Sequence, residues 1–168
     1  MVKKSQAGTL RIWAIVLAVC VPLVCADDDC TFSKSGMLQN VERIAEQFPG
    51  ASIDAERLRV TWVFENGDIE YYSVGGCYDL GGAVGRVSQL AEKRSGEAVS
   101  RVVLELARKY LPDAEAERIS DAMESSSYDN GTSGSEDFVT IGHPLGEILV
   151  SHRFAEGSDI VEVSWPVL

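Results

Sequence analysis

The sequence predicts an α+β domain: an antiparallel sheet built from two similar β-hairpins plus one further strand, with three to four helices packed on one face. Alternating apolar residues in 58–74 and 146–165 predict the hairpins, and 138–142 predicts the further strand. Helical periodicity occurs only before the first hairpin and between the two. Because hairpins imply antiparallel pairing and the helical segments are grouped, we expect the helices to form their own layer.

Four segments carry apolar residues at three- and four-residue spacing, which is the pattern of an amphipathic helix. They are 37–48, 80–91, 97–111 and 113–123. Pro49 and Gly50 end the first segment, and Pro112 separates the last two. Three glycines near the start of 80–91 weaken the first turn of that helix.

The Asn-Gly pair at 66–67 lies between the strands of the first hairpin and is a strong signal for a two-residue turn. Such a turn sets the register and places Trp62 and Tyr71 on one face, with Glu70 and Tyr72 on the other. The predicted cross-strand pairs are Phe64–Ile69, Trp62–Tyr71 and Val60–Ser73.

The second hairpin resembles the first: Val60–Phe64 aligns with Val150–Phe154, and both internal duplication and convergence explain the similarity. Before it, residues 125–136 are polar and rich in serine and glycine, so we expect a flexible loop there. Residues 27–168 have the length of one compact unit and are predicted to form a single α+β domain.

Residues 1–26 have the layout of a secretory signal peptide. Lys3, Lys4 and Arg11 make a basic start, residues 12–24 carry no charge, and Ala26 follows as a small residue at the cleavage position. We therefore expect cleavage after Ala26 and an exported protein, periplasmic or extracellular. An uncleaved membrane anchor is the alternative, although the apolar run is shorter than the roughly 20 residues of a typical span.

The chain is strongly acidic, with a formal net charge of −11. Three of its 15 basic residues and none of its 26 acidic ones lie in residues 1–26, so cleavage would change the charge to −14. Such a charge opposes binding to nucleic acid and, once the leader is removed, to anionic membranes. It favours association with a cationic protein partner.

Two of the four cysteines, Cys20 and Cys25, would leave with the leader. Cys30 and Cys77 would remain in an oxidising compartment, where a pair of cysteines predicts a disulfide. The alternative is that Cys77, which precedes a predicted helix, is the nucleophile of a cysteine hydrolase with His143 or His152 as its base.

Aromatic residues are concentrated on the predicted hairpins. If Tyr72 and Trp165 are exposed, they provide the kind of anchors that are enriched at protein interfaces. Together with Glu70 and Tyr78, they form the predicted partner surface.

His152 is expected to pair with Glu162 across the second hairpin, which would make this pair sensitive to pH. The pairing assumes that Ala155 lies opposite Asp159. No metal site or cofactor is predicted, because two histidines nine residues apart without free thiols do not make a zinc site.

These features favour an exported acidic binding protein without catalytic activity, of the inhibitor or immunity type, for a cationic partner in the cell envelope. The cysteine hydrolase described above is one alternative. A periplasmic assembly accessory that docks a peptide on a sheet edge is the other. The sequence does not indicate an oligomeric state.

Overall fold

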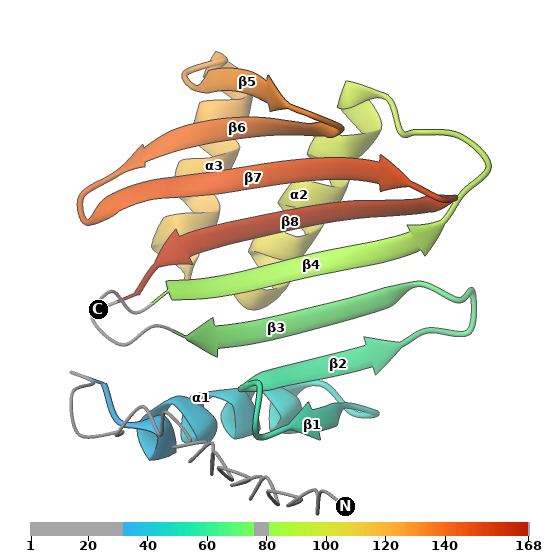
Figure 1. Cartoon of the computed structure of the whole chain (residues 1–168). Helices are drawn as coiled ribbons and strands as arrows, with labels where there is room; N and C mark the ends of the chain where they lie inside the picture. Colours follow the sequence, from blue (N-terminus) through green and yellow to red (C-terminus); the bar gives the residue numbers. More distant parts are fainter. Residues whose placement is uncertain (1–31, 76–80, 168) are drawn as a thin grey trace, which may run out of the picture.

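The computed structural model describes residues 32–75 and 81–167, which contain one eight-stranded antiparallel sheet and three helices (Figure 1). The helices are α1 (Lys34–Gln47), α2 (Gly96–Tyr110) and α3 (Asp113–Ser125). The strands are β1 (Ser52–Asp54), β2 (Arg59–Val63), β3 (Ile69–Gly75), β4 (Gly81–Gln89), β5 (Asp129–Ser133), β6 (Glu136–His143), β7 (Gly146–Ala155) and β8 (Ser158–Pro166).

The strand order is β1-β2-β3-β4-β8-β7-β6-β5, so the sheet has the same connectivity when followed from either edge. Each half is a four-stranded meander preceded by helix, and β4 pairs with β8 where the halves meet. By this symmetry β2 corresponds to β6, not to β7. The sequence similarity between Val60–Phe64 and Val150–Phe154 therefore compares strands at different places in the two halves.

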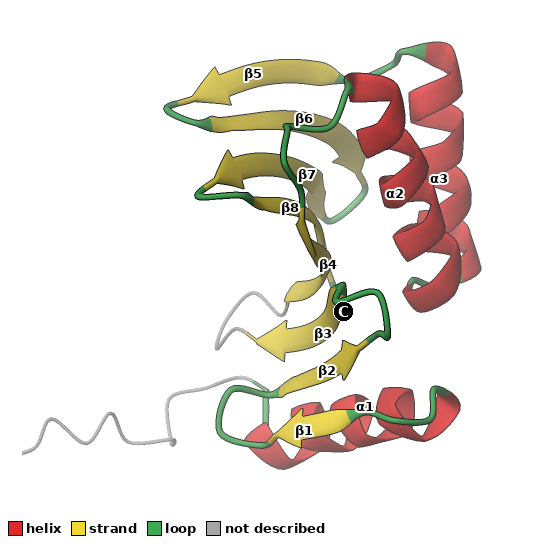
Figure 2. Ribbon diagram, turned by 90° about the vertical axis from the view of Figure 1, so that its right-hand side faces the viewer, coloured by secondary structure: helices red, strands yellow, loops and turns green. Residues whose placement is uncertain are grey.

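The predicted fold was wrong in its sheet and in its helical layer. The sheet has eight strands, and the helices do not form one group on one face. Instead α1 lies beside β1–β3 at one end, whereas α2 lies over β4 and β8 with α3 packed against it (Figure 2). The end of the sheet formed by β1–β3 is covered by α1, and its centre, where β4 meets β8, is covered by α2, which separates α1 from the other two helices.

The segment 80–91, predicted as a helix, forms strand β4. Its glycines lie where aromatic rings cross the strand: a Cβ on Gly82 would come within 2.4 Å of the Trp165 ring. A Cβ on Gly85 would come equally close to Tyr71 on the other face. Glycine is therefore needed for close approach at these positions, and it also disfavours the predicted helix.

The segment 125–136, predicted as a loop, contains strand β5 and the turn into β6. Gly131 of β5 lies under the Phe138 ring, and a Cβ at this position would come within 2.4 Å of that ring. Gly134 in the turn has a φ of 63°, which favours glycine. Serine and glycine in this segment therefore build an edge hairpin with small side chains.

The register of the β2–β3 hairpin differs by one residue from the prediction. Val63 pairs with Ile69 and Trp62 with Glu70. The turn is longer than two residues: the Phe64 amide donates to the Asp68 carbonyl, and Asn66 Oδ1 accepts from the Asp68 amide. This shift turns Glu70 and Tyr72 toward the core and Tyr71 away from it.

One hydrophobic core joins α1, α2, α3 and the sheet face that they contact. Trp62, Phe48 and Tyr110 pack with ring centroids 5.1 to 5.9 Å apart, and Trp62 Nε1 donates to the Phe48 carbonyl at 2.9 Å. Ser95 caps α2 by accepting from the Ala98 amide. None of the helices in the described residues has the length and apolar character to span a membrane.

Candidate functional site

Most residues of the predicted partner surface are buried inside the folded protein. Glu70, Tyr72 and Trp165 are only 3, 4 and 5% exposed. The one-residue change of register accounts for Glu70 and Tyr72, and Trp165 is buried against Tyr72 and Gly82. Tyr78 lies outside the described residues, as do the predicted signal peptide and the predicted Cys30–Cys77 disulfide.

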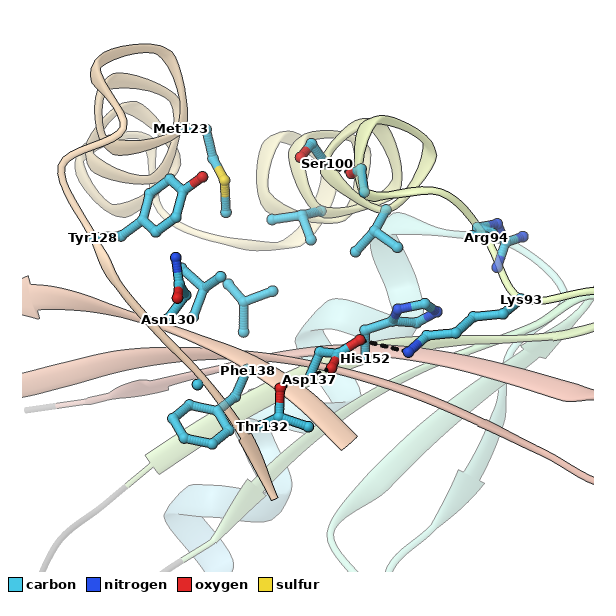
Figure 3. Close-up of a pocket in the computed structure, with 16 residues that line it drawn as sticks. Lys93, Arg94, Ser100, Met123, Tyr128, Asn130, Thr132, Asp137, Phe138 and His152 are labelled. Carbon is cyan, nitrogen blue, oxygen red and sulfur yellow. Dashed lines mark hydrogen bonds and ion pairs between the residues drawn. The ribbon is translucent and has the colours of Figure 1, made fainter. Parts of the chain in front are cut away.

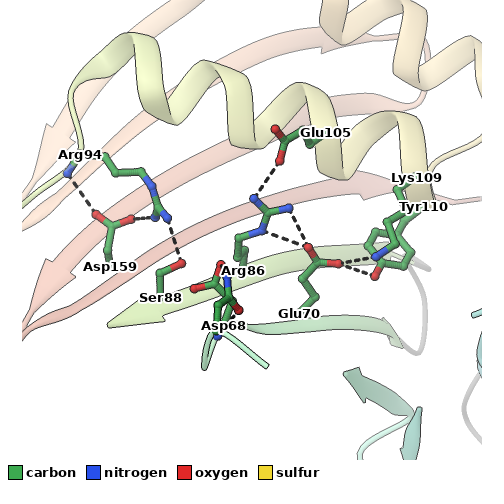
Figure 4. Close-up of polar contacts among 10 residues, drawn as sticks. Asp68, Glu70, Arg86, Ser88, Arg94, Glu105, Lys109, Tyr110 and Asp159 are labelled. Atoms are coloured by element: carbon green, nitrogen blue, oxygen red, sulfur yellow. Dashed lines mark hydrogen bonds and ion pairs between the residues drawn. The ribbon is translucent and has the colours of Figure 1, made fainter. Parts of the chain in front are cut away.

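Glu70 is the centre of a buried ionic cluster between β3, β4 and the last turn of α2 (Figure 4). Its Oε1 accepts from Arg86 Nε and Nη2 at 3.0 and 2.7 Å. Its Oε2 accepts from Lys109 Nζ at 2.8 Å and from the Tyr110 hydroxyl at 2.6 Å. Burial raises the pKa of Glu70, but these hydrogen bonds outweigh it and leave the pKa below its ordinary value.

Arg86 also donates to Glu105 of α2 at 2.8 Å, which places this arginine between two carboxylates. We call Glu70, Arg86, Glu105, Lys109 and Tyr110 the Glu70 cluster. The cluster joins the sheet to α2, so Glu70 has a structural role in the folded chain.

The predicted pairing of His152 with Glu162 was wrong. Ala155 pairs with Ser158, and this register places His152 opposite Val161. The histidine contacts Asp159 instead, with 2.8 Å between Nε2 and Oδ1. The tighter turn between β7 and β8 is the cause, because it shortens the predicted loop by one residue.

Asp159 is completely buried. Besides His152 it contacts Arg94, whose guanidinium and backbone amide both donate to the Asp159 carboxylate (Figure 4). Arg94 Nη2 donates to the Ser88 hydroxyl at 2.9 Å. Burial raises the pKa of Asp159, but the hydrogen bonds from His152 and Arg94 bring it below its ordinary value. We call Asp159, Arg94, His152 and Ser88 the Asp159 cluster.

Glu162 points to the opposite side of the sheet from His152. There it accepts a hydrogen bond from the Tyr71 hydroxyl, and the guanidinium of Arg59 lies 4.4 Å above the Tyr71 ring. Burial and the neighbouring carboxylate raise the pKa of Tyr71. The tyrosine therefore serves as a fixed neutral donor that covers Gly85.

The side of the sheet turned away from α2 and α3, which we call the outer face, carries a continuous row of apolar side chains. Cross-strand pairing joins four neighbouring strands through Val63–Ile69, Ile69–Val87 and Val87–Ile160. Val63 is 72% and Ile69 36% exposed. We call Val63, Ile69, Val87 and Ile160 the apolar row. Its residues lie near the end of β2 and of β4 and near the start of β3 and of β8, which meet at the right-hand end of the sheet in Figure 1.

Acidic side chains border this end of the sheet. Glu65 lies in the β2–β3 turn, Glu92 follows β4, and Glu156 lies in the β7–β8 turn, all of them exposed. The two latter segments are adjacent, because the Leu90 amide donates to the Gly157 carbonyl at 2.9 Å. The row ends at β7, where the exposed Arg153 pairs with Ile160. The outer face thus combines exposed and half-buried apolar groups with a border of three carboxylates and one guanidinium.

Among residues 32–75 and 81–167, no three histidine, cysteine or acidic side chains are grouped so that they could hold a metal ion. The two histidines lie beside different carboxylates: His143 Nε2 is 3.6 Å from Glu115, and His152 contacts Asp159. Cys77, the nucleophile of the predicted hydrolase, lies outside the described residues, so that alternative stays a prediction.

Comparison with protein-family models, curated proteins and solved structures gives no match to this chain. Its function is therefore inferred from the chemistry of its own residues. The apolar row was missed in the sequence because its members come from four strands, one of which was predicted to be a helix. The neighbouring residues Trp62 and Val63 were a usable signal for an exposed apolar surface. Successive side chains of a strand point to opposite faces, so a strand with apolar residues on both faces either is buried on both or leaves one apolar face exposed.

Proposed function

We propose that this chain is an exported acidic binding protein without catalytic activity, which uses the apolar row to hold a cationic protein of the cell envelope. It would act as an inhibitor or immunity-type protein. The apolar row is the observation that carries this proposal, because contiguous exposed apolar groups on a monomer commonly mark an interaction site.

The distribution of charge supports the same surface. Interface centres are depleted of charged residues, and the apolar row carries none. The acidic side chains of Glu65, Glu92 and Glu156 lie at its border, where they would attract a basic partner and raise the rate of encounter. A partner with an apolar centre and a basic rim fits this arrangement best.

Support for export comes from the sequence: residues 1–26 have the layout of a signal peptide, and two cysteines, Cys30 and Cys77, would remain in the chain after cleavage. In an oxidising compartment a Cys30–Cys77 disulfide would hold the new N-terminus close to the residues after β3. It would also leave no free thiol, which favours binding over cysteine chemistry.

The test compares three immobilised proteins for what they retain from envelope extract: the natural chain, Ile69→Lys and Leu145→Lys. Ile69 lies inside the apolar row and is 36% exposed, whereas Leu145 is 45% exposed and lies in the β6–β7 turn at the other end of the sheet. We expect the natural chain and Leu145→Lys to retain one basic protein at low ionic strength. Ile69→Lys should lose it, because the new charge is desolvated in the interface.

The retained protein is then purified and its affinity measured by calorimetry at low and high salt. The expected result is a Kd at least about tenfold weaker for Ile69→Lys, and weaker binding of the natural chain at high salt. Equal retention by all three proteins would refute the proposed surface. Retention of acidic proteins only, or affinity that does not change with salt, would refute the cationic partner.

A further inference from the structure

A cavity of about 420 Å³ lies on the inner side of the sheet, away from the apolar row (Figure 3). It is enclosed by α2, the end of α3, the residue Tyr128 that precedes β5, and strands β5–β7. It forms because α2 lies over β4 and β8, and β5 carries short side chains toward the helices. Its volume is within the range of small-molecule sites in proteins.

The two ends of this cavity differ in chemistry. Val99 and Val103 of α2, Met123 of α3, and Val139 and Val150 of the sheet form an apolar wall. Figure 3 shows Met123 and Tyr128 at one end and Lys93, Asp137 and His152 at the other. An apolar body with one polar group would match both ends.

His152 is the buried polar group at the charged end. Its Nε2 faces Asp159, and its Nδ1 makes no hydrogen bond with any described residue. The Asp159 carboxylate is ionised and can only accept, so Nε2 must carry a proton. In the neutral ring Nδ1 is then an acceptor without a donor, in a side chain that lines the cavity.

The fixed charges around the cavity cancel. Lys93 pairs with Asp137, which also accepts from the Thr132 hydroxyl at 3.2 Å. Arg94 pairs with Asp159 behind His152. A charged ligand would therefore lose its hydration without gaining an unpaired counter-charge, which is unfavourable in a partly enclosed site.

We propose that this cavity binds an uncharged compound of one or two rings that carries a hydroxyl group. The hydroxyl donates to His152 Nδ1, and the rings pack on Val99, Val103, Val139 and Val150. Met123 adds a thioether, which makes favourable contacts with aromatic rings. The site is separate from the outer face, so it does not depend on the proposed protein partner.

Three probes with the same ring system test this assignment on the natural chain. They are 2-naphthol, which is neutral, 2-naphthoate, which is an anion, and 2-naphthylmethylamine, which is a cation at neutral pH. Binding is followed by methyl NMR and calorimetry at about pH 8, where free imidazole is neutral. We expect saturable binding of 2-naphthol, with shifts at the methyl groups of Val99, Val103, Val139 and Val150, and at least about tenfold weaker binding of the two charged probes.

Two variants and one control separate the contacts. Val99→Trp fills the cavity and should abolish binding of 2-naphthol, whereas Arg101→Trp puts the same side chain on the exposed side of α2 and should not change it. His152→Leu keeps an apolar side chain of similar size but removes both ring nitrogens, and is expected to weaken binding of 2-naphthol about tenfold. Thermal unfolding of each variant shows whether it is folded.

The ligand series needs no variant, so it decides the proposal even if a substitution prevents folding. Absence of saturable binding of 2-naphthol would overturn it. So would equally tight binding of 2-naphthoate or 2-naphthylmethylamine, or methyl shifts confined to the apolar row. Unchanged affinity in a folded His152→Leu would remove the histidine from the site.

Discussion

The two halves of the sheet each bury one carboxylate beside α2, and the two clusters are built differently. In the first half Glu70 accepts four hydrogen bonds from Arg86, Lys109 and Tyr110, two on each oxygen. In the second half Asp159 accepts from Arg94 and His152, and the histidine keeps one nitrogen without a partner at a cavity.

If the cavity binds a ligand as proposed, the Glu70 carboxylate serves stability alone, whereas the Asp159 carboxylate also orients the histidine of a binding site. In the Glu70 cluster each carboxylate oxygen accepts two hydrogen bonds, and these bonds fix the end of α2 to β3 and β4. The Asp159 cluster holds the residues before α2 in the same way, but its histidine also lines the cavity. A histidine nitrogen that has no partner among the described residues, in a side chain that lines a cavity, is the feature that distinguishes the second region.

The largest expected effect is on the free energy of unfolding, which should fall more in Glu70→Gln than in Asp159→Asn. Removing the charge of Glu70 leaves two cations, Arg86 and Lys109, close together and partly buried, which should reduce the free energy of unfolding by about 3–5 kcal/mol. Removing the charge of Asp159 leaves one cation, Arg94, without its carboxylate. The expected loss is smaller, about 1.5–3 kcal/mol. Urea unfolding followed by circular dichroism measures both.

Glu105→Gln is the matched control for this comparison, because Glu105 contacts Arg86 from the solvent side with a side chain that is 60% exposed. An exposed pair contributes about 0–1 kcal/mol, so its loss should be small. If Asp159→Asn were more damaging than Glu70→Gln, the difference between the two clusters would not lie in the number of cations that each carboxylate neutralises.

The dependence of stability on pH should separate the same two clusters. The folded pKa of Glu70 lies below its ordinary value of 4.5, and that of Asp159 below its ordinary value of 3.8. Each carboxylate therefore stabilises the fold fully above its ordinary pKa, and this contribution is lost as the pH falls through the folded pKa. The stability gap between the natural chain and Glu70→Gln should begin to close at a higher pH than the gap for Asp159→Asn.

Urea midpoints between pH 7 and about pH 2.5 test this order, with buffers matched in ionic strength. Gaps that stay constant over the whole acid range would show that neither carboxylate is held ionised by its cluster. Closure of both gaps at the same pH would show that the two clusters protonate together.

Local patterns in the sequence were sufficient to predict α1, α2 and α3 within a few residues. Their apolar spacing, the Pro49-Gly50 pair and Pro112 are local signals, and these helices follow them. Strand β4 could not be found in the same way. The role of Gly82 and Gly85 depends on rings that are distant in the sequence, so their meaning is visible only once the strands are paired.

The clusters were missed for a related reason. Glu70 meets Lys109 and Tyr110 some 40 positions away, and Asp159 meets Arg94 at a separation of 65. A one-residue error of register moves every side chain of one strand to the opposite face relative to its partner strand. In the first hairpin this error placed Glu70 and Tyr72 on the surface, and in the second it placed His152 beside Glu162. Both errors came from assuming the length of a turn. In the first hairpin the Asn66 side chain accepts from the Asp68 amide within a longer turn, and in the second Ala155 pairs with Ser158 across a shorter one.

Apart from the exposed Glu105 control, the smallest effect is expected when single hydrogen bonds are removed and the charges are kept. Tyr110→Phe removes one of four donors to Glu70, and Ser88→Ala removes the hydroxyl that accepts from Arg94. Each should reduce the free energy of unfolding by about 1 kcal/mol, because the ion pairs that remain still hold the buried carboxylate. Combining Tyr110→Phe with Glu70→Gln should cost less than the sum of the two, since their partners are shared. Combining Ser88→Ala with Glu70→Gln should be additive, and a coupling between them measured in a double-mutant cycle would show that the two clusters act as one.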